Sequence, residues 1–150
     1  LAGGFDLDEA VQVARMLDEE GIDAIEVSGG TPASGARTAV RQGIETREQE
    51  AYNLPSAYRI KNAVSCPVMV VGGFRSFELV EGVIRREEAD YVAFSRPLIR
   101  EPHLPLRWQQ GDESRARCIS CNGCFKPGLK EGGICCVVDK MERESREFSL

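Results

Sequence analysis

The stretch Pro67-Val68-Met69-Val70-Val71-Gly72-Gly73 decides the fold of this chain. Its apolar part is unbroken, which is typical of a strand buried on both faces of a parallel sheet. Two glycines follow it, and glycine lets a backbone turn sharply and approach an anion closely. The stretch therefore predicts a central strand whose carboxyl end opens onto a binding site.

Helical and strand patterns alternate on both sides of this stretch. The predicted strands are residues 22–28, 67–71 and 90–95. The predicted helices are 7–20, a second from about 52 or 56 to 63, then 77–87 and 104–110. Asp6 and Glu9 form a capping-box pair at the start of the first helix, and Ser76 can cap the third. A long polar loop spans residues 29–51. Alternation of this kind predicts a parallel sheet of the α/β class.

The length limits how much of such a fold is present. One strand–helix–strand unit needs about 30 residues, whereas a closed eight-stranded barrel takes about 250. The chain has 150 residues and begins without an initiator methionine, which suggests a fragment. Residues 1–112 are thus expected to form the last three units of a (β/α)8 TIM barrel, or one small open sheet. Residues 113–150 would add a cysteine-rich segment and a charged tail.

Composition excludes several classes of function. The net charge of −5 argues against a nucleic-acid partner, whose phosphates need a basic surface. No apolar stretch approaches the roughly 20 residues of a membrane span, and no secretory signal is recognisable at the start. We expect a cytoplasmic protein with no membrane or nucleic-acid partner.

The next predicted strand ends in Ser95-Arg96, one unit after the glycine pair. Arginine offers a planar, permanently charged fork that suits phosphate, and loops after the last two strands of eight-stranded barrels commonly bind phosphate. A glycine pair alone is usually only a turn, and Arg96 alone could be a structural ion-pair partner. Their occurrence on neighbouring strands favours a phosphate site.

Five of the six cysteines gather near the carboxyl end, and they are Cys118, Cys121, Cys124, Cys135 and Cys136. The first three form a C-x2-C-x2-C run, and Cys135 or Cys136 can supply a fourth thiolate. Four thiolates hold Zn²⁺ tetrahedrally or ligate a [4Fe–4S] cluster. Disulfides or empty thiols remain the alternative to a metal site.

Three runs together resemble a known family. They are Ile25-Glu26-Val27-Ser28-Gly29-Gly30, the run from Pro67 to Arg75, and the run from Asp90 to Ile99. In order and spacing they are similar to the old yellow enzyme family, the NADH:flavin oxidoreductases that include 2,4-dienoyl-CoA reductases. The Ser-Arg-Pro-Leu run after the last strand is the most specific part.

The resemblance implies an FMN-dependent barrel in which this chain supplies strands six to eight. Implied cofactor-binding residues are Gly72, Gly73, Phe74, Ser95, Arg96, Ser28 and Gly29. NAD(P)H would reduce the flavin, which would pass hydride to an activated alkene, as ene-reductases do. The polarising histidine pair and the usual tyrosine proton donor come from earlier strands in this family, so the fragment alone is expected to be inactive. His103 matches no catalytic position and is expected at the surface or a helix end, and Tyr52, Tyr58 and Tyr91 are expected to pack.

The resemblance also favours iron–sulfur over zinc at the cysteines. Dienoyl-CoA reductase-like members carry a cluster there on a C-x2-C-x3-C pattern, from which this chain departs by one residue and by its cysteine pair. A short, single-barrel member is the closer match.

Two other functions remain open. One is a phosphate-binding barrel half of an isomerase or lyase, and the other is a metal-stabilised module without catalysis. Three barrel strands would leave two exposed sheet edges, which predicts a homo-oligomer or association with another chain.

Overall fold

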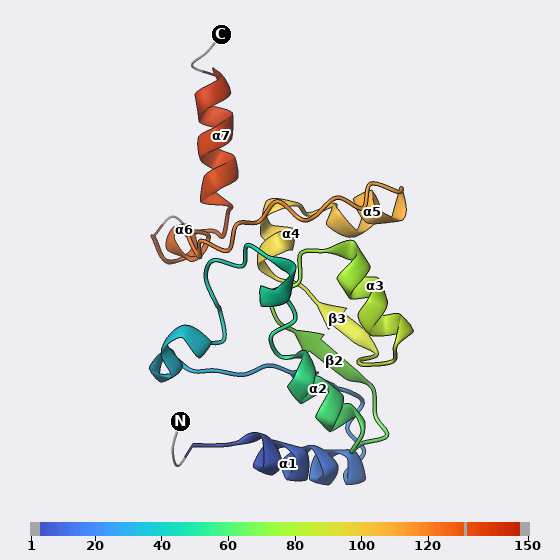
Figure 1. Ribbon diagram of the computed structural model, residues 1–150. Coiled ribbons are helices and arrows are strands. Elements are labelled where there is room, and N and C mark those ends of the chain that lie inside the picture. Colours follow the sequence, from blue (N-terminus) through green and yellow to red (C-terminus); the bar gives the residue numbers. More distant parts are fainter. Residues whose placement is uncertain (1–3, 131, 148–150) are drawn as a thin grey trace.

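The computed structural model describes residues 4–130 and 132–147 (Figure 1). Three strands, β1 (Ile25–Val27), β2 (Val68–Val71) and β3 (Tyr91–Ala93), form one parallel sheet in the order β1-β2-β3. The predicted α/β class with a parallel sheet is therefore confirmed. The outer limits of the two predicted units, residues 1–3 and 148–150, lie outside the described residues.

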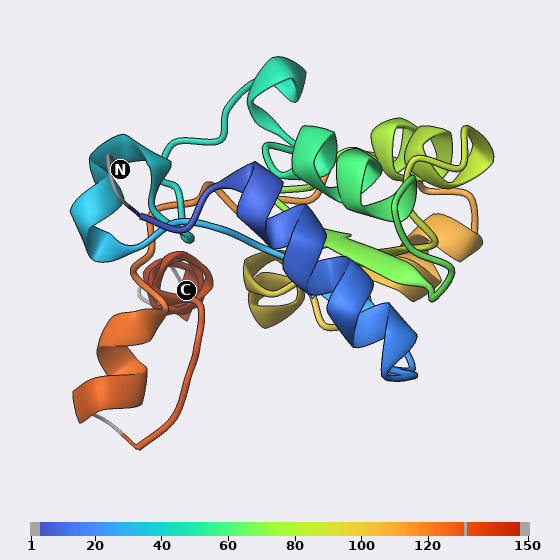
Figure 2. The same ribbon diagram turned by 90° about the horizontal axis from the view of Figure 1, so that it is seen from below.

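Helices connect and follow the strands. They are α1 (Leu7–Glu19), α2 (Leu54–Lys61), α3 (Phe77–Arg85), α4 (Arg96–Arg100), α5 (Leu104–Gln109), α6 (Phe125–Lys130) and α7 (Val137–Glu147). Two 3-10 turns, Pro32–Arg37 and Arg47–Gln49, interrupt the long loop between β1 and α2. In Figure 2, α2 and α3, the two crossover helices, lie over the same face of the sheet. Because all strands run in one direction, their carboxyl ends meet at one edge.

The main core lies between the strands and the helices on that face. Val68 and Val70 of β2 are fully buried, and they pack with Ala57, Ile60 and Val83 from the crossover helices. Alternate residues of β2 are only partly buried. The expectation that this strand is buried on both faces is thus wrong for the described residues, because helices cover one face only.

Four aromatic rings extend the core under the carboxyl edge of the sheet. Phe74 lies 6.3 Å from Phe94, and Phe94 lies 5.7 Å from Trp108, which in turn is 5.7 Å from Phe77. The Trp108 indole also donates a hydrogen bond to the Ser114 carbonyl at 3.0 Å. Edge and tilted pairs of this kind add stability beyond the area they bury, so the floor beneath the strand ends is well fixed.

Some local sequence signals predicted the helix and strand ends correctly, and others were overridden by hydrogen bonds to other parts of the chain. The capping box of Asp6 and Glu9 is present, and Gly21 has the left-handed φ of +82° that ends α1. Strand β1 begins at Ile25 rather than Ile22, because the Ile22 amide still donates to Leu17 in the turn after α1. Ser76 does not cap α3, since its hydroxyl donates to the buried Glu50 carboxylate at 2.8 Å instead.

Three helices were not expected from the sequence. Helix α4 begins at Arg96, where Arg96-Pro97 had been expected only to stop a strand, because proline is compatible with the first turn of a helix. Helix α6 lies inside the cysteine segment, and α7 occupies most of the expected charged tail and projects away from the sheet (Figure 1). Among the described residues, no helix combines the length and apolar character that crossing a membrane requires.

Candidate anion pocket and cysteine cluster

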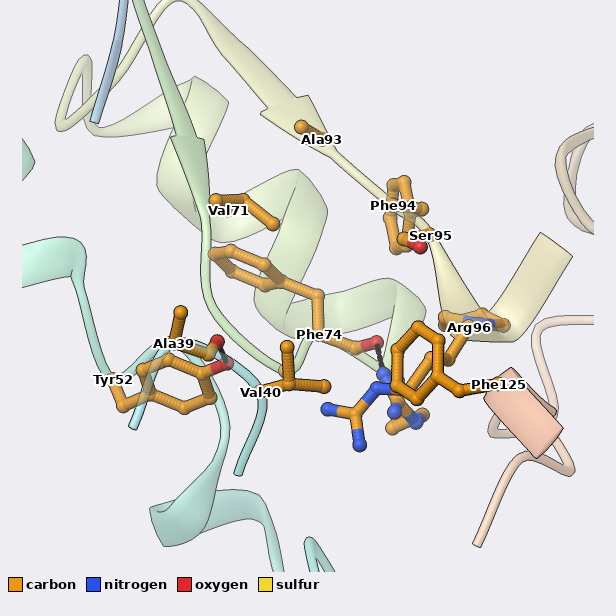
Figure 3. Close-up of a pocket in the computed structure, with 13 residues that line it drawn as sticks. Ala39, Val40, Tyr52, Val71, Phe74, Ala93, Phe94, Ser95, Arg96 and Phe125 are labelled. Atoms are coloured by element: carbon orange, nitrogen blue, oxygen red, sulfur yellow. Dashed lines mark hydrogen bonds between the residues drawn. The ribbon is translucent and has the colours of Figure 1, made fainter. Parts of the chain in front are cut away.

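A hollow of about 220 Å³ lies at the carboxyl edge of the sheet (Figure 3). We call it the anion pocket. Its walls come from the ends of β2 and β3, from the loop before α2 and from the starts of α4 and α6. The lining residues are Ala39, Val40, Tyr52, Val71, Gly73, Phe74, Arg75, Ala93, Phe94, Ser95, Arg96, Pro97 and Phe125. Gly73 of the glycine pair and Arg96, which the sequence placed after neighbouring strands, therefore meet in one pocket.

Gly73 turns the chain at the end of β2. Its φ of +76° is a left-handed conformation that side chains disfavour. A Cβ at this position would lie 2.8 Å from Cε1 of Tyr52. Tyr52 itself is fixed, because its hydroxyl donates to the Ala39 carbonyl at 2.9 Å and the Arg41 guanidinium lies 4.0 Å from its ring centre. Glycine is required at position 73 for both conformation and space.

Arg96 brings a buried positive charge to the pocket. The residue is only 7% exposed. Its Nη1 donates to the Arg41 carbonyl at 2.7 Å and to Oδ1 of Asn122 at 2.6 Å. Within the described part of the chain, neither Nε nor Nη2 has an acceptor. The guanidinium is thus held in place by one nitrogen and keeps donors for a ligand.

Arg75 is the second buried arginine of the pocket, at 1% exposure. Its guanidinium donates to the Phe74 carbonyl, to the Cys118 carbonyl and to the Ser120 hydroxyl, at 2.6, 3.2 and 2.8 Å. Burial is the main cause that lowers the pKa of this guanidinium, and the nearby positive charge of Arg96 lowers it further. Arg75 therefore connects the end of β2 to the cysteine segment and also adds positive charge to the pocket.

These two guanidinium groups have no direct ion pair among the described residues, although the Glu50 carboxylate, which accepts from the Arg75 amide, acts on Arg75 from a distance. Neither Arg75 nor Arg96 forms an ion pair with a carboxylate there. The Gly73 and Phe74 amides likewise have no acceptor in the described residues. Buried unpaired charges are costly, and a bound anion would offset that cost. The arrangement is chemically suited to a phosphate, which accepts from guanidinium and backbone N–H groups alike.

The other residues expected at the cofactor lie in different surroundings. Ser95 is exposed at the rim of the anion pocket, and Phe74 is 1% exposed and contributes mainly to the core. Ser28 and Gly29 line a separate hollow of about 410 Å³ beside α1. The structure thus brings Gly73, Phe74, Ser95 and Arg96 together and leaves Ser28 and Gly29 apart from them.

Gly72 supports the pocket from behind. A Cβ there would lie 3.0 Å from the Asn53 backbone nitrogen, and the Gly72 carbonyl accepts from the Tyr52 amide at 3.1 Å. The loop before α2 therefore packs directly on the glycine pair.

The cysteine segment, residues 118–136, lies beside this pocket. Cys118, Cys121, Cys124 and Cys136 line one small hollow of about 20 Å³, whereas Cys135 faces a different one. All of the cysteines are free thiols. In the described residues, no three or more metal-binding side chains are close enough to hold an ion. Four of the five expected cysteines are thus neighbours without forming a finished coordination site.

Arg100 borders the same small hollow. Its side chain is 6% exposed, and it donates to Glu142 at 2.7 Å and to the Arg117 carbonyl at 3.0 Å. Its Nε is buried with no partner in the described residues. An unsatisfied donor beside four thiols is suited to an electron-rich group such as a thiolate.

The sequence analysis did not predict the surroundings of several residues. Tyr52 was expected to pack but forms a pocket wall, and Tyr58 and Tyr91 are 49% and 57% exposed instead of packed. Arg75 was visible only as the end of the Gly-Gly-Phe-Arg run, and nothing marked Asn122. His103 is exposed immediately before α5, as expected.

The chain is similar in sequence and in fold to known oxidoreductases. The chain is 37% identical over 125 residues, 82% of its length, to an NADH oxidase from Thermoanaerobacter brockii. It is 33% identical over 91% of its length to the NADH-dependent flavin oxidoreductase iliE from Neonectria sp.. The structure of 6-hydroxypseudooxynicotine amine oxidase from Pseudomonas geniculata N1 matches 86% of the chain with a TM-score of 0.68 and 26% identity. No family model matches.

The chain spans about a fifth of the length of these relatives, at 19%, 18% and 18%. The names of these relatives agree with the family that the glycine and arginine runs of the sequence resemble. The chain belongs to the old yellow enzyme family of NADH:flavin oxidoreductases.

Proposed function

We propose that the anion pocket binds the phosphate of FMN and that the chain forms the phosphate-binding part of an NAD(P)H-dependent flavin oxidoreductase. One observation carries the proposal: two buried guanidinium groups share a pocket without a carboxylate partner in the described residues. The names of the relatives, which are flavin and NADH oxidoreductases, support a flavin over the substrate of an isomerase or lyase.

Each pocket residue has a distinct part in this proposal. Gly73 and Phe74 offer backbone N–H groups, and Arg96 offers Nε and Nη2 to the phosphate oxygens. Val40 and Tyr52 would bound the phosphate on the side of the long loop. Ser95 at the rim can add a hydroxyl donor. A phosphate that exchanges water for these fixed donors is held in one orientation, which positions the rest of the cofactor.

When bound, FMN supplies hydride transfer between NAD(P)H and an activated alkene. The described residues provide no histidine pair for polarising such a substrate, since the chain has one histidine and it is exposed before α5. We propose that substrate polarisation and proton donation come from other strands of the same barrel, and that this chain alone binds cofactor without turnover.

The same proposal assigns the fold. Strands β1, β2 and β3 correspond to the last three strands of a (β/α)8 barrel. The partly exposed face of β2 would then face the barrel interior, and the free edges of β1 and β3 would pair with other strands. Isolated from them, the chain is expected to associate.

The thiols provide a second binding site in this proposal. Cys118, Cys121, Cys124 and Cys136 share one hollow, which favours Cys136 over Cys135 as the fourth ligand. The donor set suits a [4Fe–4S] cluster or Zn²⁺, and the unpartnered Nε of Arg100 would stabilise the negative charge of four thiolates.

The test compares FMN with riboflavin, which lacks the phosphate. In the complete polypeptide, Arg96→Ala is expected to weaken FMN binding by on the order of a hundredfold, since a buried charge-assisted contact is lost. Riboflavin affinity should stay within a factor of about two. Arg85→Ala, which removes an exposed arginine of α3, is the matched control. Flavin fluorescence titration measures both ligands, and an unchanged FMN affinity in Arg96→Ala would exclude the phosphate assignment.

A further inference from the structure

Two polar residues lie between the cysteines and hydrogen-bond to the two arginines of the anion pocket. Ser120 and Asn122 occupy positions within the C-x2-C-x2-C run, and both have left-handed backbones, with φ of +58° and +60°. Ser120 is fully buried. Non-glycine residues in this conformation are uncommon and persist only where the surroundings fix them. The conformation of the cysteine run therefore determines where these two side chains lie.

Each side chain holds one arginine of the pocket. The Ser120 hydroxyl accepts from Nη2 of Arg75 at 2.8 Å, and Oδ1 of Asn122 accepts from Nη1 of Arg96 at 2.6 Å. Asn122 also donates through Nδ2 to the Val40 carbonyl at 3.0 Å. One amide thus fixes both the charged residue at the strand end and the loop that closes the pocket.

Further contacts join the same two regions. The Ala116 amide donates to the Arg75 carbonyl at 2.8 Å, just before the cysteine run begins. Phe125, directly after Cys124, lies against the pocket near Arg96 (Figure 3). The cysteine segment therefore lines the pocket through Phe125, and behind that lining it supplies one side-chain acceptor to each guanidinium group, from Ser120 and Asn122.

We infer that Ser120 and Asn122 are positioning residues, and that the cysteine segment and the anion pocket stabilise each other through them. This inference rests on the proposed function. Asn122 contacts Arg96 although the thiols of the described residues are not arranged around an ion. A metal that bound the thiols while keeping this conformation of the run would stabilise that contact. Conversely, a phosphate on Arg96 favours that same conformation. By linkage, each ligand raises the affinity for the other by the same factor.

Glycine substitutions test the positioning role without adding backbone strain. Asn122→Gly and Ser120→Gly delete the side chains at left-handed positions, where glycine is favoured. In the complete polypeptide, Asn122→Gly is expected to lower FMN affinity on the order of tenfold, because Arg96 loses a charge-assisted acceptor. Riboflavin affinity should not change. Asn62→Gly, which removes an amide–carbonyl bond at the end of α2, is the matched control.

The coupling is measured with Zn²⁺ as the probe for the thiols. Saturating Zn²⁺ should tighten FMN binding several-fold in the unchanged protein and should have no such effect in Asn122→Gly. Ser120→Gly, which acts through Arg75, provides an independent second variant if Asn122→Gly does not fold.

Two results overturn the inference while leaving the proposed function intact. One is an FMN-to-riboflavin affinity ratio that both glycine variants leave unchanged, and the other is an FMN affinity that does not respond to Zn²⁺. Equal affinity of the unchanged protein for FMN and riboflavin is a different outcome, because it removes the phosphate site itself.

Discussion

Gly73→Ala is the change that most directly tests the geometry of the anion pocket. The φ of +76° imposes a cost of about 1–2 kcal/mol on any residue with a Cβ. The added methyl group would also lie 2.8 Å from Cε1 and 3.2 Å from Cδ1 of Tyr52. Because Tyr52 is held by Ala39 and Arg41, the ring cannot move away without losing those contacts. Overpacking of this kind costs about 1–3 kcal/mol.

Gly21→Ala separates the two contributions. Gly21 has a similar φ of +82° but no atom within 4 Å of a Cβ at its position. We expect Gly21→Ala to lower the free energy of unfolding by about 1–2 kcal/mol and Gly73→Ala by about 3 kcal/mol in total. Urea unfolding of the complete polypeptide measures both changes. FMN affinity should fall in Gly73→Ala only, since Gly73 lines the pocket and Gly21 does not.

A second substitution checks the cause. In a protein that already carries Tyr52→Ala, the close contact is absent. Gly73→Ala should then lower the free energy of unfolding by as much as Gly21→Ala does, about 1–2 kcal/mol. The reasoning is refuted if Gly73→Ala costs no more stability than Gly21→Ala and leaves FMN binding unchanged.

Two further predictions concern groups behind the pocket and at the other end of the sheet. The buried Glu50 carboxylate accepts from the Arg75 and Ser76 amides and from the Arg115 side chain. Glu50→Gln should therefore lower the free energy of unfolding, measured in urea, by about 3 kcal/mol. A loss below about 1 kcal/mol would contradict a central role for this carboxylate. The hydrogen bond from Lys61, together with that from the Val68 amide, lowers the pKa of Asp90. Asp90 therefore stabilises the fold above its unfolded pKa of about 4 and loses that contribution as the pH falls. Asp90→Asn should make the urea midpoint less sensitive to pH between about 4 and 2. An equal pH dependence of the midpoint in both proteins would argue against this role of Asp90.

Sequence reasoning identified the elements that depend on local and periodic signals. The three strands, the crossover helices and the capping box at Asp6 follow from apolar spacing and capping chemistry, which act over a few residues. Gly73 and Arg96 were found because parallel strands necessarily bring their carboxyl ends to one edge. The exact start of β1 and the role of Ser76 were missed, since a turn hydrogen bond and the distant Glu50 carboxylate outweighed the local preference.

Long-range contacts account for what sequence reasoning could not find. Arg75 meets Ser120 across 45 residues, and Asn122 meets Val40 across 82. No local pattern records such a pairing, because the side chains become neighbours only after the chain has closed on itself. The same reason explains Tyr52, whose sequence context resembles that of any aromatic packing residue.

The sequence by itself determined the α/β class, the parallel order of the strands and the residue types available for binding an anion, because periodicity and turn chemistry are local. Only the tertiary structure decided that the two guanidinium groups are buried without an ion pair to a carboxylate among the described residues, and that Phe125 of the cysteine segment lines their pocket. Burial and charge pairing depend on which distant segments meet, and that meeting is a property of the folded chain.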